Sequence, residues 1–292
     1  MKYIFLNLKR FDVPVELGGV NRGDIHTWAR DTVVSTSSQL STDREVTYVA
    51  FFPEAHLMAA TKAATRCVTP MKIGCQSVFR SDVKKGENFG ALTSNRPAAA
   101  MRALGVSWAI IGHCEERKDK RDTLIEGGAT DMKAVDRQLN AQIKCAISQN
   151  LSVLYCIGET LEEQPRRFEV LENQMKLGLE GTDISKVAIA YEPVWAIGPG
   201  KTPPGREYIA ETAAFIKKIC DVPVVYGGGL KSDNAEMLAS IEEVDGGLIA
   251  LTRFSGDIGF YPDEYCEIAR VYLSAKNTNC AVHSISKSVE YD

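Results

Sequence analysis

The chain has 292 residues, of which 25% are charged, and its formal net charge is −4. A net charge this close to zero gives no bulk attraction to nucleic acid or to a membrane surface, so we expect neither partner. The N-terminal residues do not read as an export signal, and no stretch is apolar and long enough to predict a membrane span. The length suits one large α/β domain.

Eight cysteines are scattered along the chain without any Cys-x-x-Cys pair. Cys75, Cys145 and Cys156 lie in or beside apolar runs, which is typical of buried, reduced thiols rather than of disulfides or a zinc site. We therefore expect a cytoplasmic protein.

Eight short runs rich in β-branched and apolar residues predict strands at residues 3–8, 46–52, 72–76, 107–112, 152–158, 187–192, 222–227 and 247–251. Helical patterns lie between them, among others at residues 97–104, 131–150, 166–179 and 206–219. This rhythm predicts an α/β fold with a single closed (β/α)₈ barrel over residues 1–275, and an open doubly wound sheet is the alternative. Residues 276–292 are polar and predict a C-terminal extension.

Functional side chains of such a barrel belong at the C-terminal ends of its strands. The first predicted strand ends with Asn7 and Lys9, which point to the same side because they are two residues apart. An inward lysine is costly unless it meets an anion, so the pair favours a negatively charged ligand. A lysine that leaves the strand for solvent is the alternative.

His113 and Glu115 follow the fourth predicted strand. This histidine can be a buried structural group, and with Cys114 it can suggest metal ligation. Adjacent residues on a turn do not easily converge on one ion, so we expect no metal site. A neutral imidazole at the start of a helix would instead donate a hydrogen bond to a carbonyl oxygen.

The sixth predicted strand delivers Glu192 to a loop, where Pro193 ends the strand and Gly198 allows the chain to return as a mobile lid. Pro199 should stiffen the tip of this lid. Loss of water under the lid would raise the basicity of the carboxylate, which suits a group that takes a proton from carbon. A capping or ion-paired glutamate is the alternative for Glu192 considered alone.

The segment after Glu192 also ends like a phosphate-binding P-loop, with glycine at position 200 followed by lysine and threonine. A Walker motif needs a glycine five positions before Gly200, and Trp195 stands there. Nucleotide binding is therefore not predicted.

Together these residues resemble the triosephosphate isomerase family over about residues 1–275. The block at residues 190–198 is highly specific, the His-x-Glu block is moderately so, and the others are weak alone. The resemblance is carried by Asn7-x-Lys9, Ile111-Gly-His113-x-Glu115, Cys156-Ile-Gly-Glu159, Ala190-Tyr-Glu-Pro-Val-Trp-Ala-Ile-Gly198 and Tyr226-Gly-Gly228.

The resemblance implies a role for each residue of the site. Glu192 would be the base that shuttles a proton between adjacent carbons, and His113 would polarise the carbonyl. Asn7 and Lys9 would stabilise the enediolate and the substrate phosphate, and Glu115 would be the acidic partner beside the histidine. This chemistry needs one base and oxyanion donors, so we expect neither a metal nor a cofactor.

The implied phosphate site departs from the family pattern. It would include Gly198, Gly228 and Gly229, and Gly229 replaces the serine of the family. Ala250 and Leu251 replace a pair of glycines, and their side chains should obstruct a close backbone approach to phosphate. Arg253 could compensate with guanidinium donors, and a solvated arginine is the alternative.

The implied homodimer also shows a change. Glu116 stands where the family has arginine, and Leu92 lies near a position where the family prefers an acidic residue. We interpret these two changes as the loss of one opposite-charge pair, with dimerisation kept through different contacts.

The leading hypothesis is a ketose–aldose isomerase that interconverts dihydroxyacetone phosphate and glyceraldehyde 3-phosphate. The alternative is an isomerase of a related sugar phosphate, such as a tetrulose phosphate, because the phosphate site is altered. A non-catalytic ligand-binding barrel is disfavoured because Asn7, Lys9, His113 and Glu192 are all present.

Overall fold

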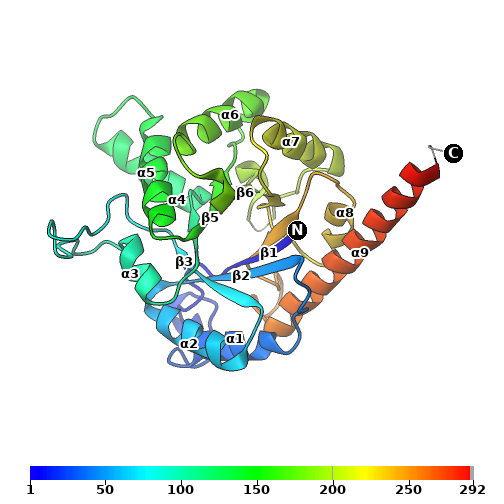
Figure 1. The fold of residues 1–292 in the computed structure, drawn as a ribbon, viewed down its shortest axis with the longest axis horizontal. Helices are drawn as coiled ribbons and strands as arrows, with labels where there is room; N and C mark the ends of the chain where they lie inside the picture. Colours follow the sequence, from blue (N-terminus) through cyan, green and yellow to red (C-terminus); the bar gives the residue numbers. More distant parts are fainter. Residues whose placement is uncertain (199, 290–292) are drawn as a thin grey trace.

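The structure, a computed structural model, describes residues 1–198 and 200–289, with side chains described through residue 278. Its strands form one closed parallel barrel in sequence order, in which the last strand pairs with the first (Figure 1). The predicted closed barrel is therefore confirmed. The strands are β1 (Lys2–Asn7), β2 (Val46–Phe52), β3 (Met71–Gln76), β4 (Trp108–Ile111), β5 (Ser152–Ile157), β6 (Val187–Tyr191), β7 (Val224–Tyr226) and β8 (Gly246–Ile249).

Strand β8 ends two residues earlier than predicted, so Ala250 and Leu251 belong to the following loop. The chain turns there because the backbone N–H groups of Thr252 and Arg253 both donate to the carbonyl of Gly259, which closes a short hairpin. This hairpin forms part of the barrel mouth.

Helices surround the barrel (Figure 1). α7 has the predicted bounds, whereas α5 begins three residues after the predicted start, because the Asp131 carboxylate first accepts from the backbone N–H of Lys133 in a turn. Within the described residues, no helix is both long and apolar enough to cross a membrane. The helices are α1 (Trp28–Ser37), α2 (Leu57–Cys67), α3 (Ala98–Ala103), α4 (Cys114–Glu126), α5 (Ala134–Ser148), α6 (Arg167–Gly178), α7 (Arg206–Ile219), α8 (Ala235–Ala239) and α9 (Pro262–Val289).

Helix α9 crosses the predicted boundary between residues 275 and 276 without a break. Residues 276–289 therefore continue a helix that packs against α1 and α8 at its beginning, and residues 290–292 lie outside the described part of the chain. The C-terminal end of α9 projects beyond the ring of helices (Figure 1). The division into barrel and extension stays a prediction.

Two layers of buried side chains hold the fold together. The inner layer fills the barrel and includes Phe5, Phe51, Trp108 and Leu248. The outer and larger layer lies between the strands and the helices. Side chains along each strand alternate between the two layers, so the barrel is a packed core and its ligand site must lie at the rim.

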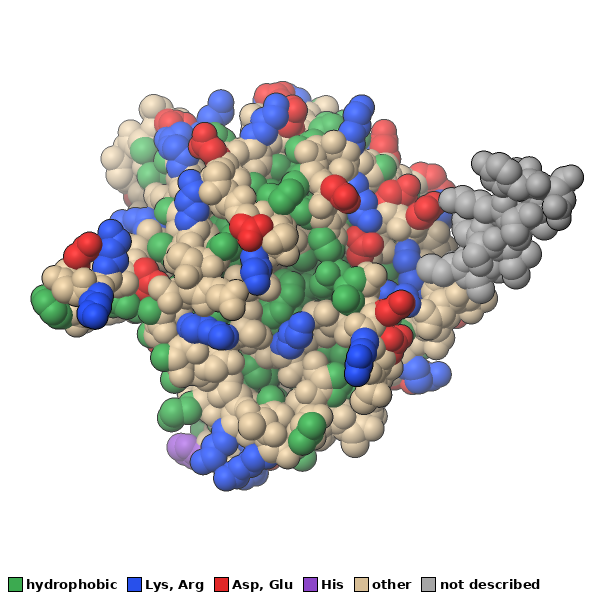
Figure 2. All heavy atoms as spheres, in the orientation of Figure 1, with side chains coloured by type: hydrophobic (Ala, Val, Ile, Leu, Met, Phe, Trp, Pro, Cys, Tyr) green, Lys and Arg blue, Asp and Glu red, His purple; other side chains and the backbone are tan. Residues whose placement is uncertain are grey.

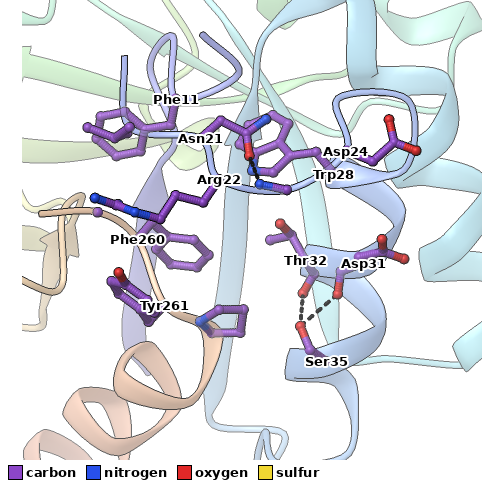
Figure 3. A pocket seen from close by; sticks show the side chains of 14 residues that line it. Phe11, Asn21, Arg22, Asp24, Trp28, Asp31, Thr32, Ser35, Phe260 and Tyr261 are labelled. Carbon is purple, nitrogen blue, oxygen red and sulfur yellow. Dashed lines mark hydrogen bonds between the residues drawn. The ribbon is translucent and has the colours of Figure 1, made fainter. Parts of the chain in front are cut away.

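Two long loops lie side by side at that rim, residues 8–27 and residues 250–261. Arg22 joins them, since its guanidinium donates to the carbonyl of Ile258 at 2.9 Å and pairs with Asp257 at 3.2 Å. A cavity of about 280 Å³ lies between the loops, with the aromatic rings of Trp28 and Phe260 among its walls (Figure 3). None of the predicted catalytic side chains lines it.

Candidate active site

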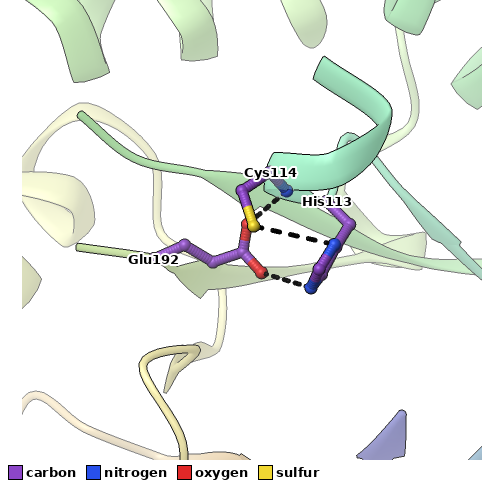
Figure 4. A group of neighbouring side chains, drawn as sticks. All are labelled: His113, Cys114 and Glu192. Atoms are coloured by element: carbon purple, nitrogen blue, oxygen red, sulfur yellow. Dashed lines mark hydrogen bonds and ion pairs between the residues drawn. The ribbon is translucent and has the colours of Figure 1, made fainter. Parts of the chain in front are cut away.

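Glu192 follows the last residue of β6 and is 1% exposed. Its Oε2 accepts a hydrogen bond from the backbone N–H of Cys114 at 2.8 Å, and its Oε1 lies 3.3 Å from Nε2 of His113 (Figure 4). That second contact is too poorly aligned for a hydrogen bond, so Oε1 has no hydrogen-bond partner among the described residues. Burial raises the pKa of Glu192, and His113 and the Cys114 N–H oppose the rise only in part.

His113 occupies the N-cap of α4, directly after β4. Its Nδ1 accepts from the backbone N–H of Glu115 at 3.3 Å, so Nδ1 carries no proton and Nε2–H is the donor of a neutral ring. That Nε2 faces Glu192 and the cavity beyond it. The ring therefore turns Nε2 toward Glu192 and the cavity, and its role as a donor to a bound molecule stays a prediction.

The ligand atoms of His113, Cys114 and Glu192 lie within 4.8 Å of one another (Figure 4). The histidine offers a different nitrogen to each neighbour, with Nδ1 at 3.8 Å from the thiol sulfur and Nε2 at 3.3 Å from the carboxylate. One ion needs a single imidazole nitrogen, so this orientation of the ring does not suit shared coordination. Burial also raises the pKa of the Cys114 thiol, which disfavours the thiolate that a metal needs.

Asn7 and Lys9 reach the same cavity from the end of β1. The Asn7 amide oxygen accepts from the Lys9 N–H at 3.0 Å and from Gln76 Nε2 at 2.9 Å, which leaves its NH₂ group as the donor for a ligand. Lys9 Nζ pairs with Glu115 Oε1 at 2.7 Å. Burial acts to raise the pKa of Glu115, but the hydrogen bond and charge of Lys9 outweigh it, so that pKa is lowered.

The cavity between these residues has a volume of about 180 Å³. Its walls include Asn7, Lys9 and His113 on one side and the lid residues Ile197 and Gly198 on another. Pro199, the predicted stiff point of the lid, lies outside the described residues. Glu192 lies directly behind the cavity wall and does not line the cavity itself. The absence of a side chain at Gly227 leaves space for the Glu192 side chain, because a Cβ at position 227 would come 2.7 Å from Glu192 Cγ.

Glu159 is a buried carboxylate beside the lid that our sequence reasoning quoted in a motif but gave no role. It is fully buried after β5, and its Oε1 accepts from Trp195 Nε1 at 2.8 Å and from the hydroxyls of Tyr191 and Tyr208, each at 3.0 Å. Trp195 begins the lid, so Glu159 anchors the lid to the barrel. An acidic residue directly after a predicted buried strand was the available signal.

The predicted phosphate residues are only partly brought together. Gly198, Gly228 and Gly229 line the cavity, as do Ala250 and Leu251. Gly229 has φ of +100°, a conformation that serine adopts only with strain, which explains a glycine at this position.

Arg253 does not lie among the residues that line the cavity. Its guanidinium pairs with Glu264 and stacks on Tyr261, with its carbon 3.9 Å from the ring centre. Lys231 and Lys201 line the cavity instead. Our sequence reasoning missed Lys231 and weighed Lys201 only as part of the rejected P-loop.

Glu116 forms its contacts within the chain. Its carboxylate accepts from the backbone N–H of Gly112, from Ser77 Oγ and from Gln142 Nε2, at 2.7, 2.9 and 2.7 Å. These bonds fix the root of the loop at residues 77–97. The carboxylate of Glu116 is therefore held by three hydrogen bonds within this chain, and none of them involves a residue near Leu92.

Comparison with known proteins agrees with this geometry. The family described as Triosephosphate isomerase matches residues 24–258. The triosephosphate isomerase of Geobacter metallireducens is 34% identical over 235 residues, covering 75% of this chain and 84% of that protein. The one from Nitratidesulfovibrio vulgaris is 30% identical over 250 residues, covering 80% and 91%.

Among solved structures, the triosephosphate isomerase of Bartonella henselae matches with a TM-score of 0.69 and 24% identity, covering 93% of this chain and 98% of that one, a likeness that shows the fold. On the strength of the family match and of these relatives, the chain belongs to the triosephosphate isomerase family.

Proposed function

We propose that this chain interconverts dihydroxyacetone phosphate and glyceraldehyde 3-phosphate by moving a proton between adjacent carbons through an enediolate. Its membership of the triosephosphate isomerase family supports this reaction. The single observation that carries the mechanism is the buried Oε1 of Glu192, which has no hydrogen-bond partner among the described residues and lies 3.3 Å from Nε2 of His113, at the edge of a cavity that Lys9 also lines.

The first step is proton removal from the carbon beside the substrate carbonyl. A turn of the Glu192 side chain past Gly227 would carry the carboxylate into the cavity, where its raised pKa makes it an effective base. The C–H electron pair then forms the carbon–carbon double bond of the enediolate, and the carbonyl oxygen gains negative charge.

The second step stabilises this charge and returns the proton. Nε2–H of His113 and the ammonium of Lys9 are the donors for the developing oxyanion. The hydroxyl proton on the first carbon must also pass to the former carbonyl oxygen, and Nε2 of His113 is the group that can give a proton to one oxygen and take one from the other. Glu192, now protonated, gives its proton to the second carbon while the carbon–oxygen double bond forms at the first, so atoms and electrons balance. Ile197 and Gly198 of the lid would keep water from the enediolate.

We also propose a homodimer in the cytoplasm. The segment between β3 and α3 projects from the barrel at the left of Figure 1, and Phe89 within it is 87% exposed. An apolar ring on a projecting loop is suited to insertion into a second copy of the chain. All seven cysteines that the structure describes are free thiols, which supports a reducing compartment.

The test is turnover by the purified protein in deuterated water, followed by NMR, with dihydroxyacetone phosphate, glyceraldehyde 3-phosphate and a tetrulose phosphate as substrates. We expect interconversion of the two triose phosphates with deuterium incorporation at the reacting carbon. Glu192→Gln should abolish turnover, whereas Glu172→Gln, on the exposed surface of α6, is the control. A folded protein that leaves both triose phosphates unchanged would rule out the proposed reaction.

A further inference from the structure

Three lysines line the cavity, and they differ in what their ammonium groups contact. Lys9 is tied to Glu115 at 2.7 Å beside His113, at the reacting end. Lys201 lies exposed on the lid. Lys231 is half-buried, and no carboxylate oxygen of the described residues lies within 4 Å of its ammonium, which instead lies 4.0 Å from the ring centre of Phe254.

The turn after β7 places Lys231 over the cavity. Its backbone N–H donates to the side-chain oxygen of Asn234 at 2.8 Å, and the Asn234 amide donates back to the carbonyl of Gly229 at 2.9 Å. Leu230, fully packed under this turn, donates its N–H to the carbonyl of Leu248 in β8. The lysine side chain folds back over the glycine turn, since a Cβ at position 229 would lie 3.7 Å from Lys231 Cε.

The donors of Thr252 and Arg253, which follow the cavity wall at Leu251, are already used. The N–H groups of Thr252 and Arg253 both bind the carbonyl of Gly259, and the Arg253 guanidinium binds Glu264. An ammonium that is partly shielded from water by Phe254 and lacks a carboxylate partner is well suited to an external anion.

We infer that Lys231 is a second cation, besides Lys9, that binds the substrate phosphate in this chain. The inference rests on the proposed function for the identity of the substrate, and it assigns to Lys231 the role for which the sequence suggested Arg253. Phe254 and Leu251 complete the site by shielding the ion pair from water.

The first test measures binding of inorganic phosphate by calorimetry to the full chain and to Lys231→Ala, Arg253→Ala and Lys176→Ala. Lys176 is exposed on α6 and pairs with Glu172, so its variant makes the same change in net charge far from the site. We expect Lys231→Ala to weaken phosphate binding roughly tenfold to hundredfold, the loss of one charged hydrogen bond, and Lys231→Arg to keep most of it. Unchanged affinity in Lys231→Ala, or a larger loss in Arg253→Ala, would overturn the inference.

The second test separates binding of the phosphate group from damage to the fold. Glyceraldehyde lacks the phosphate, so Lys231→Ala should lower kcat/KM for glyceraldehyde much less than for glyceraldehyde 3-phosphate, for which we expect a loss of roughly tenfold to hundredfold. An equal loss on both substrates would indicate a structural role and overturn the inference. Absence of turnover in the parent would reject the proposed function, and the calorimetric result would still decide whether Lys231 binds phosphate.

Discussion

At the scale of single residues, the site depends on two neighbouring side chains, those of Glu192 and His113, which are both held by the backbone of α4. Glu192 is held by a backbone N–H of α4 and lies beside the ring of His113, which is itself held by the backbone of the same helix. The base and the hydrogen-bond donor are therefore positioned by one helix N-terminus. Each of them can be tested by a substitution that separates charge, geometry and stability.

Glu192→Gln should make the protein more stable at neutral pH. Burial raises the pKa of Glu192 above its ordinary 4.5 in the folded protein. As the pH rises, the unfolded chain therefore loses this proton at a lower pH than the folded protein does, so the protonated carboxyl stabilises the folded state. This stabilisation is complete below pH 4.5 and is lost as the pH rises through the folded value. Urea unfolding of both proteins between pH 4 and 8 should show a difference that grows with pH. A difference that is constant, or that grows toward acid pH, would contradict the raised pKa.

His113→Gln should reduce kcat by roughly 10²- to 10⁴-fold, the usual contribution of a proton donor to the transition state. It also removes the N-cap acceptor of α4, which should cost about 1 kcal/mol of stability. His113→Asn is the matched variant, because asparagine is a good N-cap and should restore stability without restoring the rate. If His113→Asn recovered activity along with stability, the histidine would be structural.

At the scale of elements, the central unit is a strand followed by its loop. Strand β2 was predicted at its observed bounds, because all its residues except Thr47 are apolar. Strand β8 was predicted to continue into Ala250 and Leu251, because these residues are as apolar as the strand itself. The strand ends earlier because of a hairpin held by hydrogen bonds to Gly259, which no local sequence pattern reveals. The glycines and prolines of the lid were enough to predict its position, but the hydrogen bond from Trp195 to Glu159 that anchors it was not predicted.

The lid anchor predicts an effect of Trp195→Phe. This change keeps an aromatic ring and removes the N–H that binds Glu159 Oε1, while the hydroxyls of Tyr191 and Tyr208 still donate to that oxygen. We expect kcat/KM for glyceraldehyde 3-phosphate to fall roughly tenfold or more, because a hydrogen bond to a charged group that fixes the lid is lost. Stopped-flow and steady-state kinetics check this. Parent kinetics combined with a lower melting temperature would show that the bond serves only stability.

At the scale of the whole molecule, a parallel sheet follows from eight apolar runs separated by helices, whereas its closure into a barrel is shown by the pairing of β1 with β8. Four of the site residues, Asn7, Lys9, His113 and Glu192, could be predicted because barrel geometry places every strand end at one rim. The role that we infer for Lys231 could not be predicted, because it depends on where Arg253 and Glu264 meet across a loop. Sequence spacing carries no information about that contact.

The projecting loop predicts how the molecule associates. Phe89→Asp should shift a dimer toward monomers at micromolar concentration, because a charge replaces an apolar ring that would be buried by a second copy. Val68→Asp is the control, since Val68 is 89% exposed at the end of α2 and its φ of +51° suits aspartate. Sedimentation velocity checks both variants. Equal behaviour of the two would place the dimer contact elsewhere or leave the protein monomeric.

The central claim is that the Glu192 carboxylate is the base of an isomerase, and Glu192→Asp tests it most directly. This variant keeps the charge and withdraws it by one methylene, so steady-state kinetics on glyceraldehyde 3-phosphate should show kcat reduced by about a hundredfold or more while KM changes little. An aspartate variant with the parent kcat would show that a different group takes the proton.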